Sequence, residues 1–168
     1  MSDKQKQDEA NRRKPEEIKE IQEYLAKKNI KAQQTKSGVF YEIISRGSGP
    51  MADSGKIVSI HYTGYTLDGR FFDSNVDETK QAQKHPMQPF EFTAGVGGAI
   101  PGMVEAITEF GKGDKGRMFV PAVLGYGANP RGGPIKPWEN LVFDIEVIDV
   151  RDNTPPPAPG PQPPAPNR

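Results

Sequence analysis

The sequence contains no cysteine. Disulfide bonds, zinc–thiolate sites, cysteine nucleophiles and a lipid-bearing cysteine are therefore excluded in the chain as written. The two histidines, His61 and His85, belong to no cluster with the spacing of metal ligands. Basic and acidic side chains number 22 each, so no basic footprint for nucleic acid or anionic lipid is present. The sequence predicts no metal or other cofactor.

Long apolar runs are missing as well. None approaches the ~20 residues that a membrane-spanning helix needs, and the first residues are polar rather than typical of an export signal. The chain as written is therefore expected in the cytoplasm. The periplasm is the alternative if Met1 takes the place of a removed export signal.

Composition divides the chain into three zones. Residues 1–35 are rich in charge and glutamine and contain one expected helix. Residues 36–151 carry the patterning of a folded domain. Residues 152–168 are rich in proline, which predicts a disordered tail of polyproline-II character. A solvated, stiff tail is favoured over a ligand for an aromatic groove.

The helix expected in the first zone has Pro15 in its first turn, where proline is well tolerated. Ile18, Ile21 and Leu25 then fall on one face. Because this apolar stripe is narrow, a weakly held helix is favoured. The alternatives are a helix that docks on the main domain and one that pairs with a second copy of the chain.

Apolar and polar residues alternate through much of the second zone, which is typical of half-buried strands. The expected strands lie at 39–44, 58–63, 70–73, 90–93 and 141–147. One amphipathic helix interrupts them: it begins at Pro101 and ends before Gly111. A single short helix among antiparallel strands predicts an α+β domain with the helix packed on one face of the sheet.

Six short stretches follow one another along this domain. They are VSIHYTG (58–64), LDGRFFDS (67–74), FEF (90–92), AIPGM (99–103), LGYG (124–127) and LVFDIEV (141–147). In this order and spacing they closely resemble the FKBP family of peptidyl-prolyl cis-trans isomerases. Any one stretch alone is common, whereas six in order are highly specific. The resemblance covers nearly the whole central domain, but neither the first zone nor the tail.

The resemblance implies a strongly twisted antiparallel β-sheet that curls around one short α-helix. It also implies an enzyme, a rotamase that accelerates rotation about X-Pro bonds in folding or unfolded polypeptides. The alternative is a chaperone module that binds proline-containing segments, with isomerisation incidental. The expected partners are proline-containing polypeptide clients and macrolides, without nucleic acid or membrane. The chain is expected to be a monomer or a weak dimer through the N-terminal helix.

By the same resemblance, a ligand pocket lies between the concave face of the sheet and the start of the helix. The implied catalytic residues are Tyr62, Phe72, Asp73 and Tyr126. The implied substrate-binding residues are Phe90, Ala99, Ile100, Met103 and Phe143. Taken singly, each has an ordinary structural explanation, as a core aromatic or a turn residue. The functional interpretation depends on their joint occurrence.

Three features depart from the family pattern. Met103 stands where the best-known members carry tryptophan, which predicts weaker binding of macrolides such as rapamycin while isomerase activity persists. The loop between Asp73 and Phe90 is longer than in minimal members, and a tolerated surface insertion is favoured over a role in gripping unfolded chains. Arg131 stands where an imidazole is common. Neither Arg131 nor Trp138, which the resemblance places near substrate access, is assigned a catalytic role.

Overall fold

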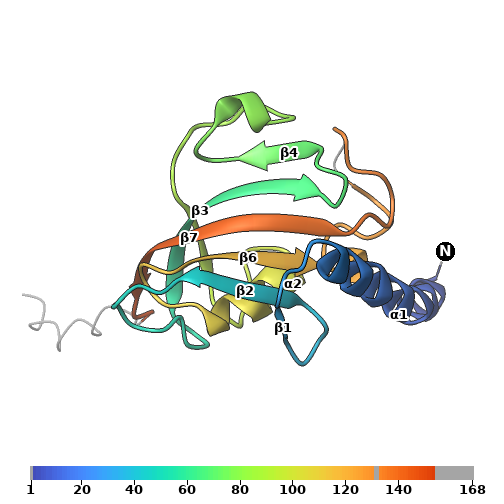
Figure 1. Cartoon of the computed structure of the whole chain (residues 1–168), viewed down its shortest axis with the longest axis horizontal. Helices are drawn as coiled ribbons and strands as arrows, with labels where there is room; N and C mark the ends of the chain where they lie inside the picture. Colours follow the sequence, from blue (N-terminus) through green and yellow to red (C-terminus); the bar gives the residue numbers. More distant parts are fainter. Residues whose placement is uncertain (1, 131–132, 154–168) are drawn as a thin grey trace, which may run out of the picture.

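The computed structural model describes residues 2–130 and 133–153, which form one seven-stranded antiparallel sheet with helices on it (Figure 1). The strands are β1 (Gln33–Gln34), β2 (Phe40–Ser45), β3 (Ile57–Thr66), β4 (Phe71–Ser74), β5 (Phe90–Thr93), β6 (Lys115–Val120) and β7 (Leu141–Arg151). The helices are α1 (Asp3–Lys27) and α2 (Pro101–Ala106), with 3₁₀ turns η1 (Glu78–Lys80), η2 (Ile107–Glu109) and η3 (Ala122–Leu124). The predicted α+β class is confirmed. The predicted disordered tail lies, from residue 154 onward, outside the described residues.

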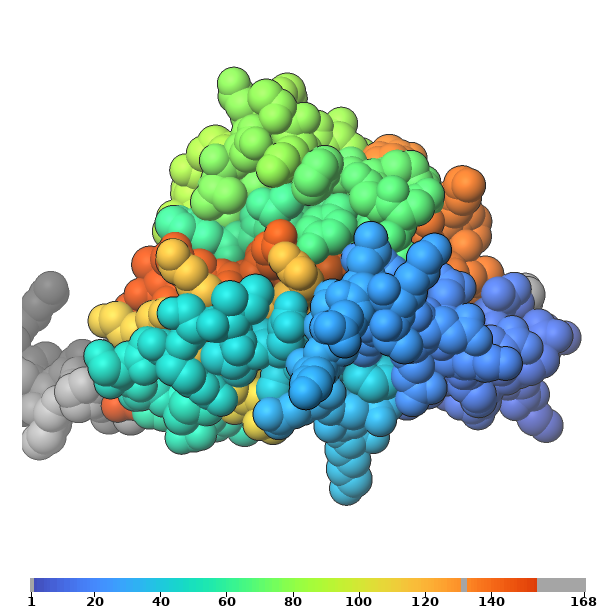
Figure 2. Space-filling model, viewed as in Figure 1, coloured from blue at the N-terminus to red at the C-terminus, as the bar shows by residue number. Residues whose placement is uncertain are grey.

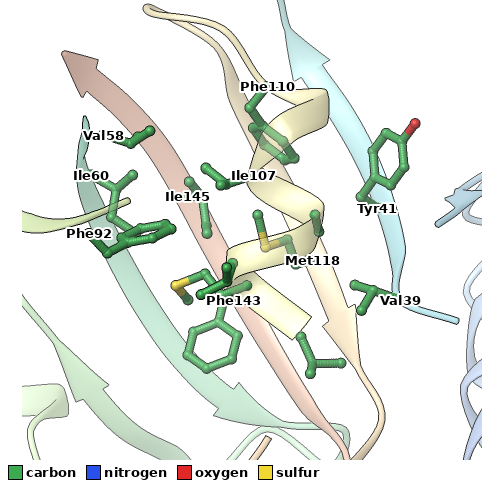
Figure 3. Close-up of a cluster of buried hydrophobic side chains, with 14 of the residues drawn as sticks. Val39, Tyr41, Val58, Ile60, Phe92, Ile107, Phe110, Met118, Phe143 and Ile145 are labelled. Carbon is green, nitrogen blue, oxygen red and sulfur yellow. The ribbon is translucent and has the colours of Figure 1, made fainter. Parts of the chain in front are cut away.

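The sheet is built around the long strands β3 and β7. The strand order is β1-β2-β6-β7-β3-β4, with β5 paired to the first half of β3. The concave face of the sheet carries the main hydrophobic core, and α2 packs into it. Figure 3 shows Val58, Ile60, Phe92, Met118 and Ile145 gathered around that helix. Burial of this apolar surface is the main favourable contribution to folding.

The α2 segment is shorter than the sequence pattern suggests. Its first residue is Pro101, as expected, and Ile100 is the residue that caps it. After Ala106 the helix tightens into the 3₁₀ turn η2. This helical segment is capped at its C-terminal end by Phe110, which is fully buried. Gly111 follows, so the predicted end of the helical segment is correct.

Helix α1 begins earlier than predicted. Ser2 caps it: the backbone N–H of Gln5 donates to Ser2 Oγ at 3.2 Å, and the backbone N–H of Ser2 donates to Gln5 Oε1 at 2.8 Å. This reciprocal capping satisfies two backbone donors at the helix start. Pro15 therefore lies inside α1 and not in its first turn, so the predicted start was wrong.

The prediction of a weakly held helix was also wrong, because α1 docks on its own domain. Ile21 and Leu25 are buried against Phe40, Phe119 and Val142 on the convex face of the sheet. Their strand neighbours point the other way, into the main core, since side chains alternate along a strand. Figure 2 shows α1 and the segment after it covering one end of this face.

A buried carboxylate lies in the same interface. Glu17 is almost fully buried and its Oε1 accepts a hydrogen bond from the backbone N–H of Val123, in η3, at 2.9 Å. Asn140 links the same parts: its amide donates to the Glu17 carbonyl at 3.2 Å and its Oδ1 accepts from the N–H of Ala122 at 2.9 Å. Burial raises the pKa of Glu17 above its ordinary value. Helix α1 therefore holds the segment that leads to Tyr126.

Strand β6 was not predicted. It lies between β2 and β7. Only glycine fits at its second position, Gly116, because a Cβ atom there would be 2.4 Å from the Glu42 carbonyl oxygen.

Within the described residues, no helix combines the length and the apolar character needed to cross a bilayer.

Candidate functional site

A cavity of about 560 Å³ opens between the concave face of the sheet and the first turn of α2. It is lined by Tyr62, Asp73, Phe90, Gly98, Ala99, Ile100, Met103, Tyr126 and Phe143. Eight of the nine residues expected at the site are therefore brought together. The ninth, Phe72, lies behind the wall of the cavity and contacts two of its aromatic rings.

The aromatic wall comes from neighbouring strands. Phe143 on β7 meets Tyr62 on β3 at 6.5 Å and Phe72 on β4 at 5.6 Å between ring centroids, both nearly edge to face. Phe90 meets Tyr62 at 5.9 Å in the same manner. Such tilted pairs are the favourable geometry for aromatic rings. Gly64 makes the packing possible, because a Cβ atom there would be 2.6 Å from the Phe72 ring.

The polar wall is the carboxylate of Asp73. The Tyr62 hydroxyl donates to its Oδ2 at 2.6 Å, and the backbone N–H of Ser74 donates to its Oδ1 at 2.8 Å. Burial is the main reason that the pKa of Tyr62 is raised above its ordinary value, and the Asp73 hydrogen bond adds to it. The tyrosine hydroxyl therefore stays protonated at neutral pH and remains a donor to the carboxylate.

The cavity floor and rim come from the start of α2. Met103 is almost fully buried, whereas Ala99 and Ile100 are half-buried at the rim. The Ile100 carbonyl accepts from the N–H groups of Met103 and Val104 at 3.0 and 3.1 Å. This first turn supplies an apolar floor to the cavity that the Asp73 carboxylate also lines.

Asn75 braces the site from behind and was not predicted. Its Oδ1 accepts from the backbone N–H of Tyr62 at 2.7 Å, and its amide donates to the carbonyls of Ile60 and Gln88 at 3.0 and 2.9 Å. All of its hydrogen bonds are made inside the protein, as a buried amide requires. It thus ties the loop after β4 to the strand that carries Tyr62.

Trp138, which was discussed with the site, does not line the cavity. Trp138 packs against α1, where the Arg13 guanidinium lies 4.4 Å from its ring centroid. Arg131 lies outside the described residues. In the described part of the chain, no three acidic, histidine or cysteine side chains converge in a way that would hold a metal ion.

The model of the family "FKBP-type peptidyl-prolyl cis-trans isomerase" matches residues 49–148. The chain belongs to this family. It is 33% identical over 135 residues to the FKBP-type 22 kDa peptidyl-prolyl cis-trans isomerase of Escherichia coli. This match covers 80% of this chain and 60% of that relative. It is 35% identical over 113 residues to an FK506-binding protein of Neisseria meningitidis, covering 67% of this chain and 96% of that protein.

A solved structure of a peptidyl-prolyl cis-trans isomerase has the same architecture. The crystal structure of a peptidyl-prolyl cis-trans isomerase from Pseudomonas syringae superposes with a TM-score of 0.63 at 27% identity, covering 82% of this chain and 96% of that one. The predicted family is confirmed, and the comparisons do not favour the alternative of a binding module with incidental isomerisation.

Proposed function

We propose that the aromatic cavity binds the proline of an X-Pro segment and accelerates rotation about the peptide bond before it. The observation that carries this proposal is the joint placement of aromatic rings and the Asp73 carboxylate around one hollow of about 560 Å³. The substrates are proline-containing polypeptides.

The reaction itself breaks no covalent bond. Its barrier of ~18–20 kcal/mol is the loss of amide resonance as the bond twists. The twisted bond is less polar at the carbonyl and has a more pyramidal nitrogen. A site that removes water and surrounds the proline ring with apolar rings favours that state over the planar one.

We assign roles from the position of each residue around the cavity. Tyr62, Phe90 and Phe143 bury the pyrrolidine ring, and Met103 supports it from below. Asp73 faces the carbonyl that rotates and is held by Tyr62. Its role is electrostatic positioning and not proton transfer. Two further residues, Ile100 through its backbone N–H and Tyr126 through its hydroxyl, hold carbonyls of the bound peptide.

Asp73→Leu tests the polar wall. We expect kcat/KM for X-Pro rotation to fall by about tenfold or more, because the Tyr62 hydroxyl loses its charged acceptor and the rotating carbonyl loses its electrostatic partner. Exchange NMR on an X-Pro peptide measures the rate directly. The matched control is Asp53→Leu, in an exposed turn outside the cavity. Equal activity of the Asp73 variant and the control would show that the assigned site is wrong.

Macrolides are proposed as weak ligands of the same cavity. The thioether of Met103 fills space but presents no flat ring to a macrocycle. We expect rapamycin to bind the parent about tenfold more weakly than Met103→Trp, as one aromatic contact is worth ~1 kcal/mol or more. Calorimetric titration of both proteins gives the comparison. Equal affinities contradict this role for Met103.

We propose that the chain acts as a monomer. The apolar side chains of α1 that would pair with a second copy, Ile21 and Leu25, are already buried against the chain's own sheet. Sedimentation should therefore give a single molecular mass over a wide concentration range. A mass that rises with concentration supports the alternative, a weak dimer.

A further inference from the structure

The long loop between β4 and β5 returns to the cavity. The backbone N–H of Ala82 donates to the Phe72 carbonyl at 3.0 Å, and the Gln81 amide donates to the carbonyls of Ser74 and His85 at 2.8 and 3.2 Å. These bonds fasten the loop to the strand that carries Asp73. Figure 1 shows the loop with η1 beyond the β4 edge of the sheet. The sequence pattern favoured a tolerated surface insertion here, whereas the structure brings one of its side chains to the site.

That side chain is His85. Its Nε2 lies 2.5 Å from Asp73 Oδ1, and its Nδ1 lies 3.0 Å from the Pro86 carbonyl oxygen. A carboxylate and a carbonyl both accept hydrogen bonds, so each ring nitrogen must carry a proton to satisfy both partners. The Gln81 amide nitrogen also lies 3.3 Å from Nε2 and 3.5 Å from Nδ1, but its two N–H groups are directed to the Ser74 and His85 carbonyls. The geometry therefore fits the imidazolium. Neutral histidine has one N–H and loses one of the two bonds.

The surroundings of His85 favour the same charge state. Asp73 on β4 faces it directly, with Tyr62 on β3 hydrogen-bonded to the other carboxylate oxygen. Tyr126 lines the small cavity of about 240 Å³ that His85 also borders. Lys84, the residue before it in the chain, directs its ammonium group to the Glu78 carbonyl. The hydrogen bond to Asp73 is the main reason that the pKa of His85 is raised above its ordinary value.

We propose that His85 is a positioning residue for X-Pro rotation, which in its protonated form holds the Asp73 carboxylate in place from the side opposite Tyr62. Asp73 is then fixed through both oxygens, by the Tyr62 hydroxyl on Oδ2 and by the Ser74 N–H and the imidazolium on Oδ1. The imidazolium adds a charged side-chain partner to these bonds and leaves the carboxylate less freedom to turn away from a bound peptide. This inference rests on the proposed function of the cavity.

The consequence is a pH-dependent activity. Because the pKa of His85 is raised in the folded protein, the ring stays charged past the ordinary histidine range and loses its proton only at higher pH. As the pH rises through that value, one hydrogen bond is lost and Asp73 is less firmly held. We expect kcat/KM to fall by about fivefold across this step, with kcat changing more than KM.

The experiment measures exchange-NMR rates on an X-Pro peptide across a pH range on both sides of neutrality. His85→Gln cannot carry charge and should give a flat profile at about one fifth of the parent's upper level. His85→Arg keeps the charge and should give a flat profile near the upper level. His61→Gln is the matched control, since His61 lies near Glu146 on the other face of the sheet, away from the cavity, and should keep the parent profile.

The outcomes separate this inference from the function on which it rests. A parent that does not accelerate X-Pro rotation at any pH overturns the proposed function and the role of His85 with it. An active parent whose rate and pH profile are unchanged in His85→Gln overturns the role of His85 alone. Circular dichroism of each variant confirms that the fold is retained.

Discussion

Replacing Phe143 by alanine is expected to lower kcat/KM for X-Pro rotation by about a hundredfold, because burial of one aromatic ring is worth ~2–3 kcal/mol. The ring contacts Tyr62 in the cavity wall and Phe72 behind it, so its removal also frees both of these rings to move inward. Water then reaches the bound amide, and the twisted state loses its apolar surroundings. The measurement is the exchange-NMR rate per folded molecule.

The control for this prediction is Phe119→Ala. Phe119 is fully buried and Phe143 almost fully buried, but Phe119 lies on the convex face beneath α1. Both changes should cost ~3–5 kcal/mol of stability, whereas only the first should change the rate per folded molecule. If either variant is too unstable to measure, Phe143→Leu and Phe119→Leu allow the same comparison with a smaller loss of side-chain volume. Equal rates for the two variants contradict the role of Phe143.

Replacing Ile21 by alanine is expected to lower the free energy of unfolding by ~2–5 kcal/mol. The residue is fully exposed on an isolated helix but fully buried in this fold, between α1 and the outer face of the sheet. Removal of its side chain leaves a cavity beside Phe119 and Val142. Urea unfolding, monitored by far-ultraviolet circular dichroism, gives the free energy.

Gln22→Ala is the control, because Gln22 is exposed on the same helix and should change stability by ~0.5 kcal/mol or less. Similar values for the two variants would mean that α1 is not docked. Docking of α1 also affects the site. The Glu17 carboxylate on α1 accepts a hydrogen bond from the backbone N–H of Val123, just before the segment that carries Tyr126. We therefore expect amide exchange in the segment around Tyr126 to be faster in Ile21→Ala than in the control.

The strands with clear alternation were predictable from the sequence. Val58 and Ile60 are buried in β3, as their spacing indicated, and the Asp68–Gly69 turn has the positive φ of 89° at glycine that the dipeptide suggested. These features depend only on neighbours in the chain. Local patterning was therefore enough to predict the fold class and most of the strands.

Strand β6 was missed, and the docking of α1 was given only as an alternative, for one shared reason. Met118, Phe119 and Val120 form a continuous apolar run. Met118 and Val120 face the main core, while Phe119 on the other face is buried by α1. The alternation that marks a strand is therefore absent. The narrow stripe on α1 gave no sign of its partner, because Phe40 and Val142 look like ordinary core residues in the sequence.

The site was predictable through the family resemblance and not through periodicity. Alternation alone assigns Phe90 and Phe143 to the core, and only the six ordered stretches placed them at a pocket. Asn75 and His85 were missed because their partners are set by the path of the long loop. A lone polar residue in a loop carries no spacing from which such a contact can be inferred.

Titration of isotope-labelled protein with an unlabelled X-Pro peptide tests the central claim most directly. We predict that chemical-shift changes concentrate at Tyr62, Ile100, Tyr126 and Phe143 around the cavity, while exchange between the cis and trans peptide signals accelerates. Changes centred instead on the outer face of the sheet, around Ile44 and Val76, would contradict the account. So would binding at the cavity without any acceleration of the exchange.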